Sequence, residues 1–145
     1  MTPQEISDAI DATFLAYSNG DLDGFANCFA EDLHYEDTSG PPIEGRQAFK
    51  DYAQGWFNAC SDRRMRPVRK IISGHEAAVE LHLTGTHNGA PMYGIEPTGA
   101  RIDFHFATTM KLEAGAVTEL KAWYNPLTTM QAVGLVGDLP NRPTG

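Results

Sequence analysis

Two long runs of alternating apolar and polar residues, joined by a glycine-rich stretch, constrain the fold of this chain more than any other feature. The runs cover residues 77–87 and 100–112, and glycine recurs through the connection from Gly85 to Gly99. An alternation with a period of two places successive side chains on opposite faces of a β-strand. The pattern therefore predicts two long neighbouring strands with a loop between them.

Shorter runs with the same period flank this pair and extend the predicted sheet. They cover residues 66–73 and 117–125, and glycine-containing turns separate them from the long strands. A brief additional strand is expected at residues 33–37, just before a turn that is rich in glycine and proline. The second half of the chain is therefore predicted to form most of one sheet.

The N-terminal part of the sequence has a different period and predicts helices. Thr2, Pro3 and Glu5 form the pattern of a capping box with proline in the first turn, which favours a helix start. Apolar residues then recur at helical spacing, namely Ile6, Ile10, Phe14 and Tyr17. We expect a short second helix after Asp21 and a third helix over residues 46–59.

Three helices followed by a curved antiparallel sheet predict an α+β fold. A length of 145 residues fits one domain, which we place at residues 1–136, with a short last segment at 127–136. Residues 137–145 are rich in proline, glycine and asparagine, and we expect them to form a flexible tail. One face of such a sheet packs against helices, and the other must meet water or a second subunit.

Composition narrows the class of partner. The net charge of −8 argues against binding to nucleic acid and against attachment to anionic membranes. The two cysteines, Cys28 and Cys60, are too few for a disulfide scaffold and lie in apolar helical patterns that favour a structural role. The N-terminus lacks the pattern of a signal peptide, so we expect a cytoplasmic protein.

The loop between the long strands resembles the signature of the SnoaL-like polyketide cyclase family. Its two parts are Thr86-His87-Asn88-Gly89 and Gly94-Ile95-Glu96-Pro97-Thr98-Gly99. Near the N-terminus, His34-Tyr35-Glu36-Asp37 and Gly45-Arg46 are similar to a strand and a helix entry of the same family. The resemblance implies the cone-shaped fold of the nuclear transport factor two-like superfamily over nearly the whole chain.

The resemblance also implies an activity, and a homodimer that meets through the outer face of the sheet. Polyketide cyclases of this type close a ring by an aldol reaction, in which an enclosed aspartate serves as acid and base without metal or cofactor. Related limonene epoxide hydrolases place an aspartate on the equivalent last strand. Here the two expected acidic positions are Ala122 and Asn125. Asn125 cannot take a proton from carbon, but at the inner end of a pocket its amide would hydrogen-bond a substrate oxygen.

Other residues could supply the chemistry of a pocket. The candidate catalytic residues are Asp37, His34, Tyr124 and Asn125. Asp37 is the best remaining general base if it is buried, since burial raises the pKa of a carboxylate. The alternative for Asp37 is a solvated acid at a strand end that caps the following turn. Tyr124 is a candidate hydroxyl donor, or a packed aromatic with a satisfied hydroxyl.

Aromatic residues are numerous enough to build a pocket wall. The candidate ligand-binding residues are Tyr17, Tyr52, Trp56, Phe104, Phe106, Trp123 and Met92, the last as part of a lid. By alternation, His82, Asp103 and His105 lie on the opposite, outer face, where a dimer interface is favoured over catalysis. No histidine or cysteine spacing indicates a zinc site, so no metal is expected.

These patterns lead to a ranked set of functions. The first is a cofactor-independent enzyme that acts on a small, largely apolar carbonyl compound, of the polyketide-cyclase or isomerase type. The alternative is a non-catalytic binding or accessory protein that keeps the pocket but lacks the family's acid. A second alternative is an epoxide hydrolase. The expected partners are a small apolar or aromatic molecule and a second copy of the chain.

Overall fold

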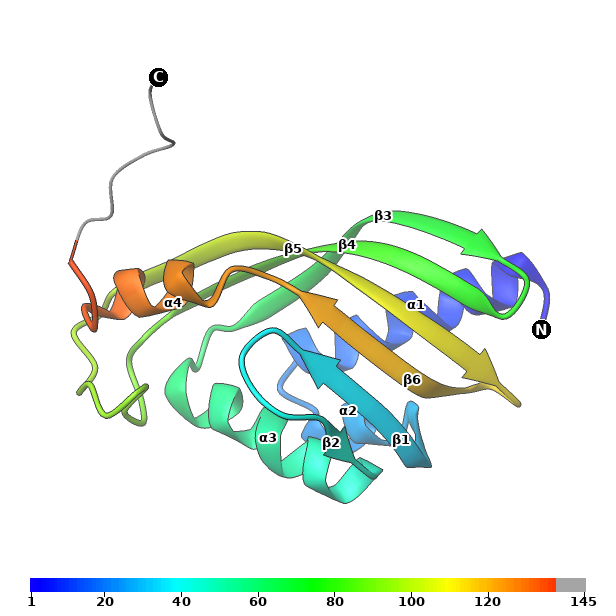
Figure 1. The fold of residues 1–145 in the computed structure, drawn as a ribbon, viewed down its shortest axis with the longest axis horizontal. Coiled ribbons are helices and arrows are strands. Elements are labelled where there is room, and N and C mark those ends of the chain that lie inside the picture. The colour runs from blue at the N-terminus through cyan, green and yellow to red at the C-terminus, as the bar shows by residue number, and fades with distance from the viewer. Residues whose placement is uncertain (138–145) are drawn as a thin grey trace.

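One curved sheet of six strands forms the frame of the computed structural model, which describes residues 1–137 (Figure 1). The strands are β1 (Phe29–Asp37), β2 (Ile43–Glu44), β3 (Arg64–Ser73), β4 (Glu76–Thr86), β5 (Arg101–Glu113) and β6 (Ala116–Trp123). The helices are α1 (Pro3–Ser18), α2 (Leu22–Ala26), α3 (Arg46–Ala59) and α4 (Pro126–Val133). The predicted α+β class is confirmed, and the tail predicted at 137–145 lies outside the described residues beyond Gly137.

The sheet is mixed rather than wholly antiparallel, which corrects the sequence prediction. Its order is β2-β1-β6-β5-β4-β3, and β1 runs parallel to β6, with Tyr35 opposite Leu120 and Asp37 opposite Ala122. All other pairs are antiparallel. Alternation in the sequence reports which face a side chain occupies but not the direction of the neighbouring strand. The parallel pair brings the ends of β1 and β6 together, and this junction becomes one side of the cavity described below.

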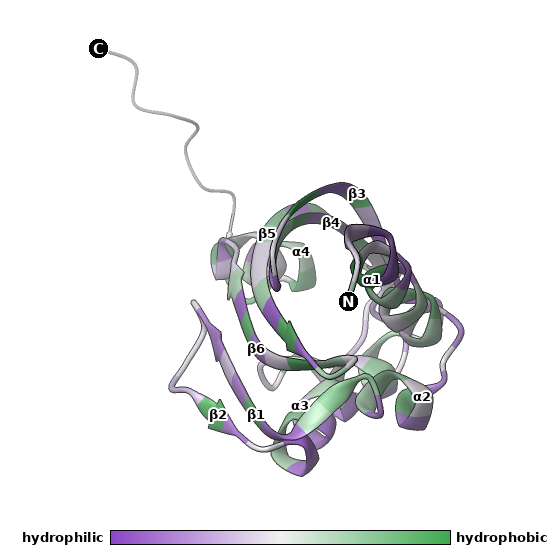
Figure 2. Ribbon diagram, turned by 90° about the vertical axis from the view of Figure 1, so that its right-hand side faces the viewer, coloured by the Kyte–Doolittle hydropathy of each residue, from purple (hydrophilic) through white to green (hydrophobic). Residues whose placement is uncertain are grey.

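The long helix α1 closes the open side of the curved sheet. Its predicted capping box is confirmed: Thr2 Oγ1 accepts from the Glu5 N–H at 3.1 Å, and Glu5 Oε2 accepts from the Thr2 N–H at 2.6 Å. The buried face of α1 packs toward β3, whereas α3 packs against β1 and β2, and α2 lies between α1 and α3 in the contacts it makes (Figure 2). Helices and strands thus surround a common apolar interior.

The loop that resembles the family signature packs against the C-terminal end of α3. A side chain at Gly89 would place its Cβ 2.0 Å from the Asn58 carbonyl oxygen, so glycine is required there. Thr86 donates its hydroxyl to Asp62 at 2.7 Å, and the fully buried His87 bonds the Ala90 carbonyl through Nε2 at 2.9 Å. These residues hold the loop in place by hydrogen bonds and close packing, away from the central cavity.

Within residues 1–137, no helix combines the length and the apolar character that crossing a membrane requires.

Candidate active site

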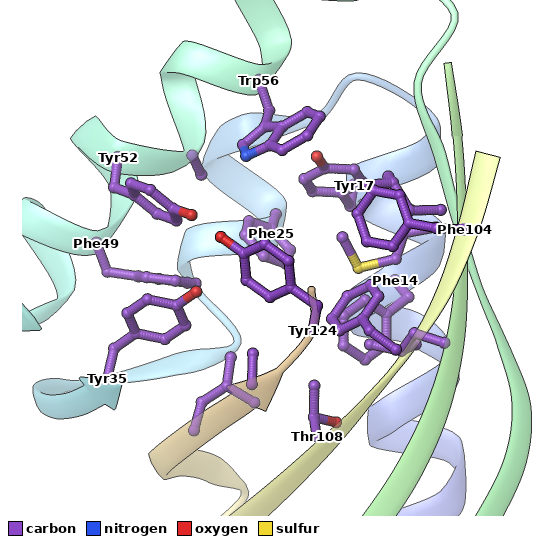
Figure 3. A pocket seen from close by; sticks show the side chains of 17 residues that line it. Phe14, Tyr17, Phe25, Tyr35, Phe49, Tyr52, Trp56, Phe104, Thr108 and Tyr124 are labelled. Atoms are coloured by element: carbon purple, nitrogen blue, oxygen red, sulfur yellow. The ribbon is translucent and has the colours of Figure 1, made fainter. Parts of the chain in front are cut away.

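A cavity of about 80 Å³ opens between the helices and the inner face of the sheet. Seventeen residues line it (Figure 3). Sixteen of them come from α1, α2, α3 and the strands β1 and β3–β6, and the last, Tyr124, directly follows β6. Ten of them are aromatic: Phe14, Tyr17, Phe25, Tyr35, Phe49, Tyr52, Trp56, Phe104, Phe106 and Tyr124. Because a cavity of about 150 Å³ holds a benzene-sized molecule, a ligand of one or more rings must extend through the mouth or widen this space.

The cavity has a deep end and a mouth, which differ in burial. At the deep end, Tyr17 is 3% exposed, and the neighbouring phenylalanines of the wall are equally buried. At the mouth, Tyr52, Trp56 and Tyr124 are only half-buried. A molecule that entered the cavity would pass the half-buried aromatic residues before it reached Tyr17.

Asp37 lies at this mouth and accepts four hydrogen bonds. Its Oδ2 accepts from the hydroxyl of Tyr35 at 2.7 Å and from that of Tyr52 at 3.1 Å. Its Oδ1 accepts from the backbone N–H of Ser39 at 2.7 Å and from the Ser39 hydroxyl at 2.6 Å. Asp37 is not itself a wall residue, but two phenols of the wall connect it to the cavity. We call Asp37 and the hydroxyls of Tyr35, Tyr52 and Tyr124 the phenol cluster, whose three tyrosines are labelled in Figure 3.

The hydrogen bonds decide the charge state of the phenol cluster. Burial acts to raise the pKa of Asp37, but the donors from Ser39, Tyr35 and Tyr52 outweigh it and leave the pKa below the ordinary value of 3.8. Burial raises the pKa of Tyr35 and of Tyr52 far above the ordinary value of 10.0. At neutral pH the cluster therefore holds one ionised carboxylate and neutral phenols. The sequence-based expectation of a raised pKa for Asp37 is wrong because it counted burial without the hydrogen bonds.

The comparisons with known proteins now decide the family. A family model described as the SnoaL-like domain matches residues 10–120, which is most of the chain. This chain belongs to the SnoaL-like family. Among curated proteins, none matches this SnoaL-like chain in sequence.

Solved structures share the fold of this SnoaL-like protein at low sequence identity. AclR of Streptomyces galilaeus, a candidate hydroxylase, has a TM-score of 0.85 and 19% identity, covering 97% of this chain and 87% of its own. A candidate SnoaL-like polyketide cyclase from Jannaschia sp. CCS1 has a TM-score of 0.82 and 18% identity, covering 94% and 98%. IdmH of Streptomyces antibioticus, a candidate polyketide cyclase, has a TM-score of 0.76 and 20% identity, covering 88% and 97%. These likenesses confirm the predicted fold, and their differing names show that the fold alone does not fix the reaction.

Within the SnoaL-like fold, the predicted site residues fall into two groups. Six of them are wall residues of the cavity: Tyr17, Tyr52, Trp56, Phe104, Phe106 and Tyr124. Asp37 adjoins the wall through its hydrogen bonds with two phenols. The sequence reasoning missed Tyr35, although it shares a strand face with Asp37 two residues on. That spacing along β1 was the signal that could have found it.

Four predicted site residues lie elsewhere. Trp123 is 49% exposed and opposite Ala107, so it belongs to the outer face of the sheet. Asn125 caps α4, where its Oδ1 accepts from the Leu127 N–H at 3.1 Å, and it is exposed rather than at the inner end of the cavity. Met92 packs against a separate small cluster that includes Ile102. Trp123 alternates with the wall residues Ala122 and Tyr124 and so faces outward, and the position that the family resemblance implied for Asn125 is occupied by the start of α4.

His34, the fourth of these residues, does not line the cavity either. Its Nδ1 lies 2.6 Å from Glu44 Oε1, and its Nε2 lies 2.9 Å from Glu36 Oε1. Hydrogen bonds with Glu36 and Glu44 raise the pKa of His34 above its ordinary value of 6.5. His34 therefore forms surface ion pairs with Glu36 and Glu44 and is not part of the cavity wall.

The outer face of the sheet carries the polar cluster that alternation predicted there. His82 Nε2 lies 2.6 Å from Asp103 Oδ1, and His105 Nδ1 lies 3.0 Å from Glu80 Oε2. The two imidazoles stack with ring centroids 4.2 Å apart. Within residues 1–137, no group of three or more histidine, cysteine, aspartate or glutamate side chains has the arrangement of a metal site.

Proposed function

We propose that this SnoaL-like protein is an enzyme that removes a proton from the carbon next to a carbonyl group in a small, largely apolar compound. One observation carries the proposal: an ionised carboxylate, Asp37, is hydrogen-bonded to phenols that line an otherwise apolar cavity. Carbon-acid chemistry needs a base together with donors for the oxygen that gains charge. Aspartate with tyrosine donors is a known solution to that requirement on a protein scaffold.

The weakest bond of the phenol cluster gives a route for the substrate. The Tyr52 hydroxyl lies 3.1 Å from Asp37 Oδ2, whereas the other three donors lie at 2.6–2.7 Å. A substrate carbonyl can accept the hydrogen bond that Tyr52 otherwise donates to Asp37. One lone pair of Oδ2 is then free. Oδ2 then accepts the proton from the adjacent carbon, and the electron pair of the C–H bond moves into the enolate.

The phenols offset the charge that develops on the carbonyl oxygen. The hydroxyls of Tyr52 and Tyr124 face the same part of the cavity as that of Tyr35 (Figure 3). Neutral phenols in a water-poor site are effective donors to an enolate oxygen. Return of the proton from Asp37 to a different carbon completes an isomerisation. In a ring closure, the enolate carbon attacks a second carbonyl of the same molecule, and Asp37 returns its proton to the alkoxide that forms. Neither outcome consumes a cofactor.

Deuterium exchange tests the proposal without knowledge of the natural substrate. Acetophenone and β-tetralone are flat ketones whose exchangeable hydrogens are followed by proton NMR in heavy water. We expect the protein to accelerate exchange above the buffer rate, and Asp37→Asn to reduce that acceleration by about 10²–10⁴-fold, which is the usual contribution of a general base. Asp103→Asn, which removes a carboxylate from the outer face, is the matched control and keeps the acceleration. Equal exchange rates for the wild type and Asp37→Asn would exclude Asp37 as the base.

A binding protein without catalysis is the second candidate, and one observation favours it. All four acceptor positions of Asp37 are filled by Ser39, Tyr35 and Tyr52, so the carboxylate also serves to order the phenols. In that case both ketones bind but neither exchanges above the buffer rate. Epoxide hydrolysis is less favoured, because that reaction needs a water held between carboxylates, and among the described residues Asp37 is the one carboxylate that is hydrogen-bonded to the cavity wall.

We also propose a homodimer that forms through the outer face of the sheet. Val68, Ile71 and Trp123 expose 46%, 55% and 49% of their surface. Strand register places Ile71 and Trp123 on this face, together with the histidine and carboxylate pairs. Exposed aromatic and aliphatic side chains surrounded by paired polar groups are typical of an association surface.

A further inference from the structure

The hydroxyl of Tyr17 is a polar atom at the deep end of the cavity with no partner. Tyr17 is 3% exposed and belongs to the cavity wall. Its oxygen makes no hydrogen bond to any residue of the described chain. A hydroxyl that is removed from water without a partner destabilises the folded state. Buried phenol hydroxyls usually have a partner, so this exception indicates a group that is supplied from outside the chain.

The ring of Tyr17 is held in place and cannot turn to find a partner within the protein. It makes edge-on contacts with Phe25 and Phe57, with ring centroids 5.2 Å and 5.0 Å away and interplanar angles of 68° and 88°. These contacts fix the phenol from two sides, so the direction of its hydroxyl is set by packing. Figure 3 shows Tyr17 among the labelled residues that surround the cavity.

A buried cation adds to the preference of this end for an oxygen acceptor. The Arg63 guanidinium stacks 3.6 Å above the Phe57 ring centroid and lies 5.8 Å from that of Tyr17. Arg63 is 7% exposed and forms no ion pair with any described carboxylate. Burial raises the pKa of Tyr17, and the charge of Arg63 only partly opposes this, so the phenol stays a neutral donor. The positive potential favours an acceptor that carries partial negative charge.

We propose that the Tyr17 hydroxyl donates a hydrogen bond to a second oxygen of the substrate, at the end opposite the carbonyl that meets the phenol cluster. This inference rests on the proposed function, because it takes the phenol cluster as the site of the reacting carbonyl. The substrate class is then a flat, apolar carbonyl compound with a further carbonyl or hydroxyl oxygen at its leading end. Tyr17 selects such compounds over analogues that lack the oxygen, because the pairing relieves a buried donor.

The test compares two probes that differ by one oxygen. para-Hydroxyacetophenone has oxygens at both ends of a flat ring, whereas acetophenone has only the ketone. Binding is measured by calorimetry for the wild type and for Tyr17→Phe, which removes only the hydroxyl. In the wild type, we expect the second oxygen to improve affinity roughly two- to tenfold, the range of one net hydrogen bond. In Tyr17→Phe we expect this ratio to fall to about one.

Thr129→Val is the matched control variant. Thr129 is fully buried in α4, and its hydroxyl also lacks a partner among the described residues, but it does not line the cavity. We expect this variant to keep the affinity ratio of the wild type. We also expect Tyr17→Phe without ligand to melt at or above the wild-type temperature, since it removes an unpaired buried hydroxyl. This melting curve shows that the variant is folded.

The outcomes separate this inference from the proposed function. An affinity ratio that is equal in the wild type and Tyr17→Phe overturns the inference, and it means that water satisfies the hydroxyl. Loss of the ratio in both Tyr17→Phe and Thr129→Val overturns it as well, because the effect is then not local. If the ratio is lost only in Tyr17→Phe while Asp37→Asn leaves deuterium exchange unchanged, the Tyr17 contact stands and the proposed reaction fails.

Discussion

The outer face of strands β4 and β5 and the cavity behind their inner face differ in how their polar atoms are satisfied. On the outer face, His82 pairs with Asp103 and His105 pairs with Glu80, so each polar group has a partner on the neighbouring strand. On the inner side of the molecule, the Tyr17 hydroxyl has no partner among the described residues. These outer-face groups therefore need no outside partner for hydrogen bonding, and the face is compatible with the homodimer that we propose. The cavity behind the inner face retains an unpaired donor, the Tyr17 hydroxyl of α1, to which we assign an outside acceptor.

The same difference appears in what controls ionisation. On the outer face, a hydrogen bond from His82 lowers the pKa of Asp103, so pairing dominates. Around the cavity, burial is the largest cause of the raised pKa values of Tyr17, Tyr35 and Tyr52. Desolvation therefore keeps the phenols as neutral donors, while pairing keeps Asp103 charged. Adjacent residues of β1 show both causes: burial dominates the raised pKa of Tyr35, and the hydrogen bond from His34 dominates the lowered pKa of Glu36.

The largest expected effect concerns the assembly that we assign to the outer face. Replacing both Ile71 and Trp123 by lysine places two charges where the proposed dimer buries apolar surface. We expect light scattering to give the mass of two chains for the wild type and 15.8 kDa for the double variant. Leu15→Lys, a change at a side chain of α1 that is 61% exposed, is the matched control and keeps the dimer. A wild type that stays at 15.8 kDa contradicts the proposal.

Adjacent residues on β4 give the next largest contrast. Leu81 is fully buried on the inner face, so Leu81→Ala should lower the free energy of unfolding by about 2–5 kcal/mol. His82 faces outward and makes an ion pair that is partly exposed in the single chain, so in the monomeric double variant His82→Ala should cost less than about 1 kcal/mol. Urea denaturation of the two variants measures the difference. Similar losses in the wild-type background would mean that the outer face is buried in the assembly.

The phenol cluster predicts a pH-dependent contribution to stability. The folded-state pKa of Asp37 lies below its ordinary value of 3.8, so the ionised carboxylate stabilises the fold above that value. As pH falls from 3.8 through the folded-state pKa, this contribution is lost. We expect Asp37→Asn to be less stable than the wild type near neutral pH and the gap to shrink in acid. Urea melts over this range check it, and a gap that widens in acid contradicts the lowered pKa.

The smallest expected effect concerns Asn125, which the structure moves from the cavity to a helix cap. Asn125→Ala removes the cap of α4 and should cost about 0.5–2 kcal/mol. Asn125→Asp retains an acceptor at the positive end of the helix and should match or exceed the stability of the parent near neutral pH. Thermal melts measure both. A clear loss of stability for Asn125→Asp would instead indicate a desolvated position.

Patterns of period determined much of this protein. The capping box at Thr2 placed the first helix, and helical spacing predicted α3 at residues 46–59, where the structure has it. Alternation assigned Leu81 to the inside and His82 to the outside before any contact was known. These features are local, because they depend on side-chain direction within one element and on the burial of apolar surface.

Tertiary structure decided which distant residues meet. The parallel pairing of β1 with β6 brings Asp37 beside Ala122, and α3 brings Tyr52 to the same carboxylate. The assignment of Trp123 to the cavity went against alternation, which places Ala122 and Tyr124 inward and Trp123 outward, and the position that the family resemblance implied for Asn125 is taken by the start of α4. Burial alone predicted a raised pKa for Asp37, whereas hydrogen bonds from separate elements lower it. Such contacts depend on strand direction and three-dimensional packing, and neither is recorded in the spacing of residues along one element.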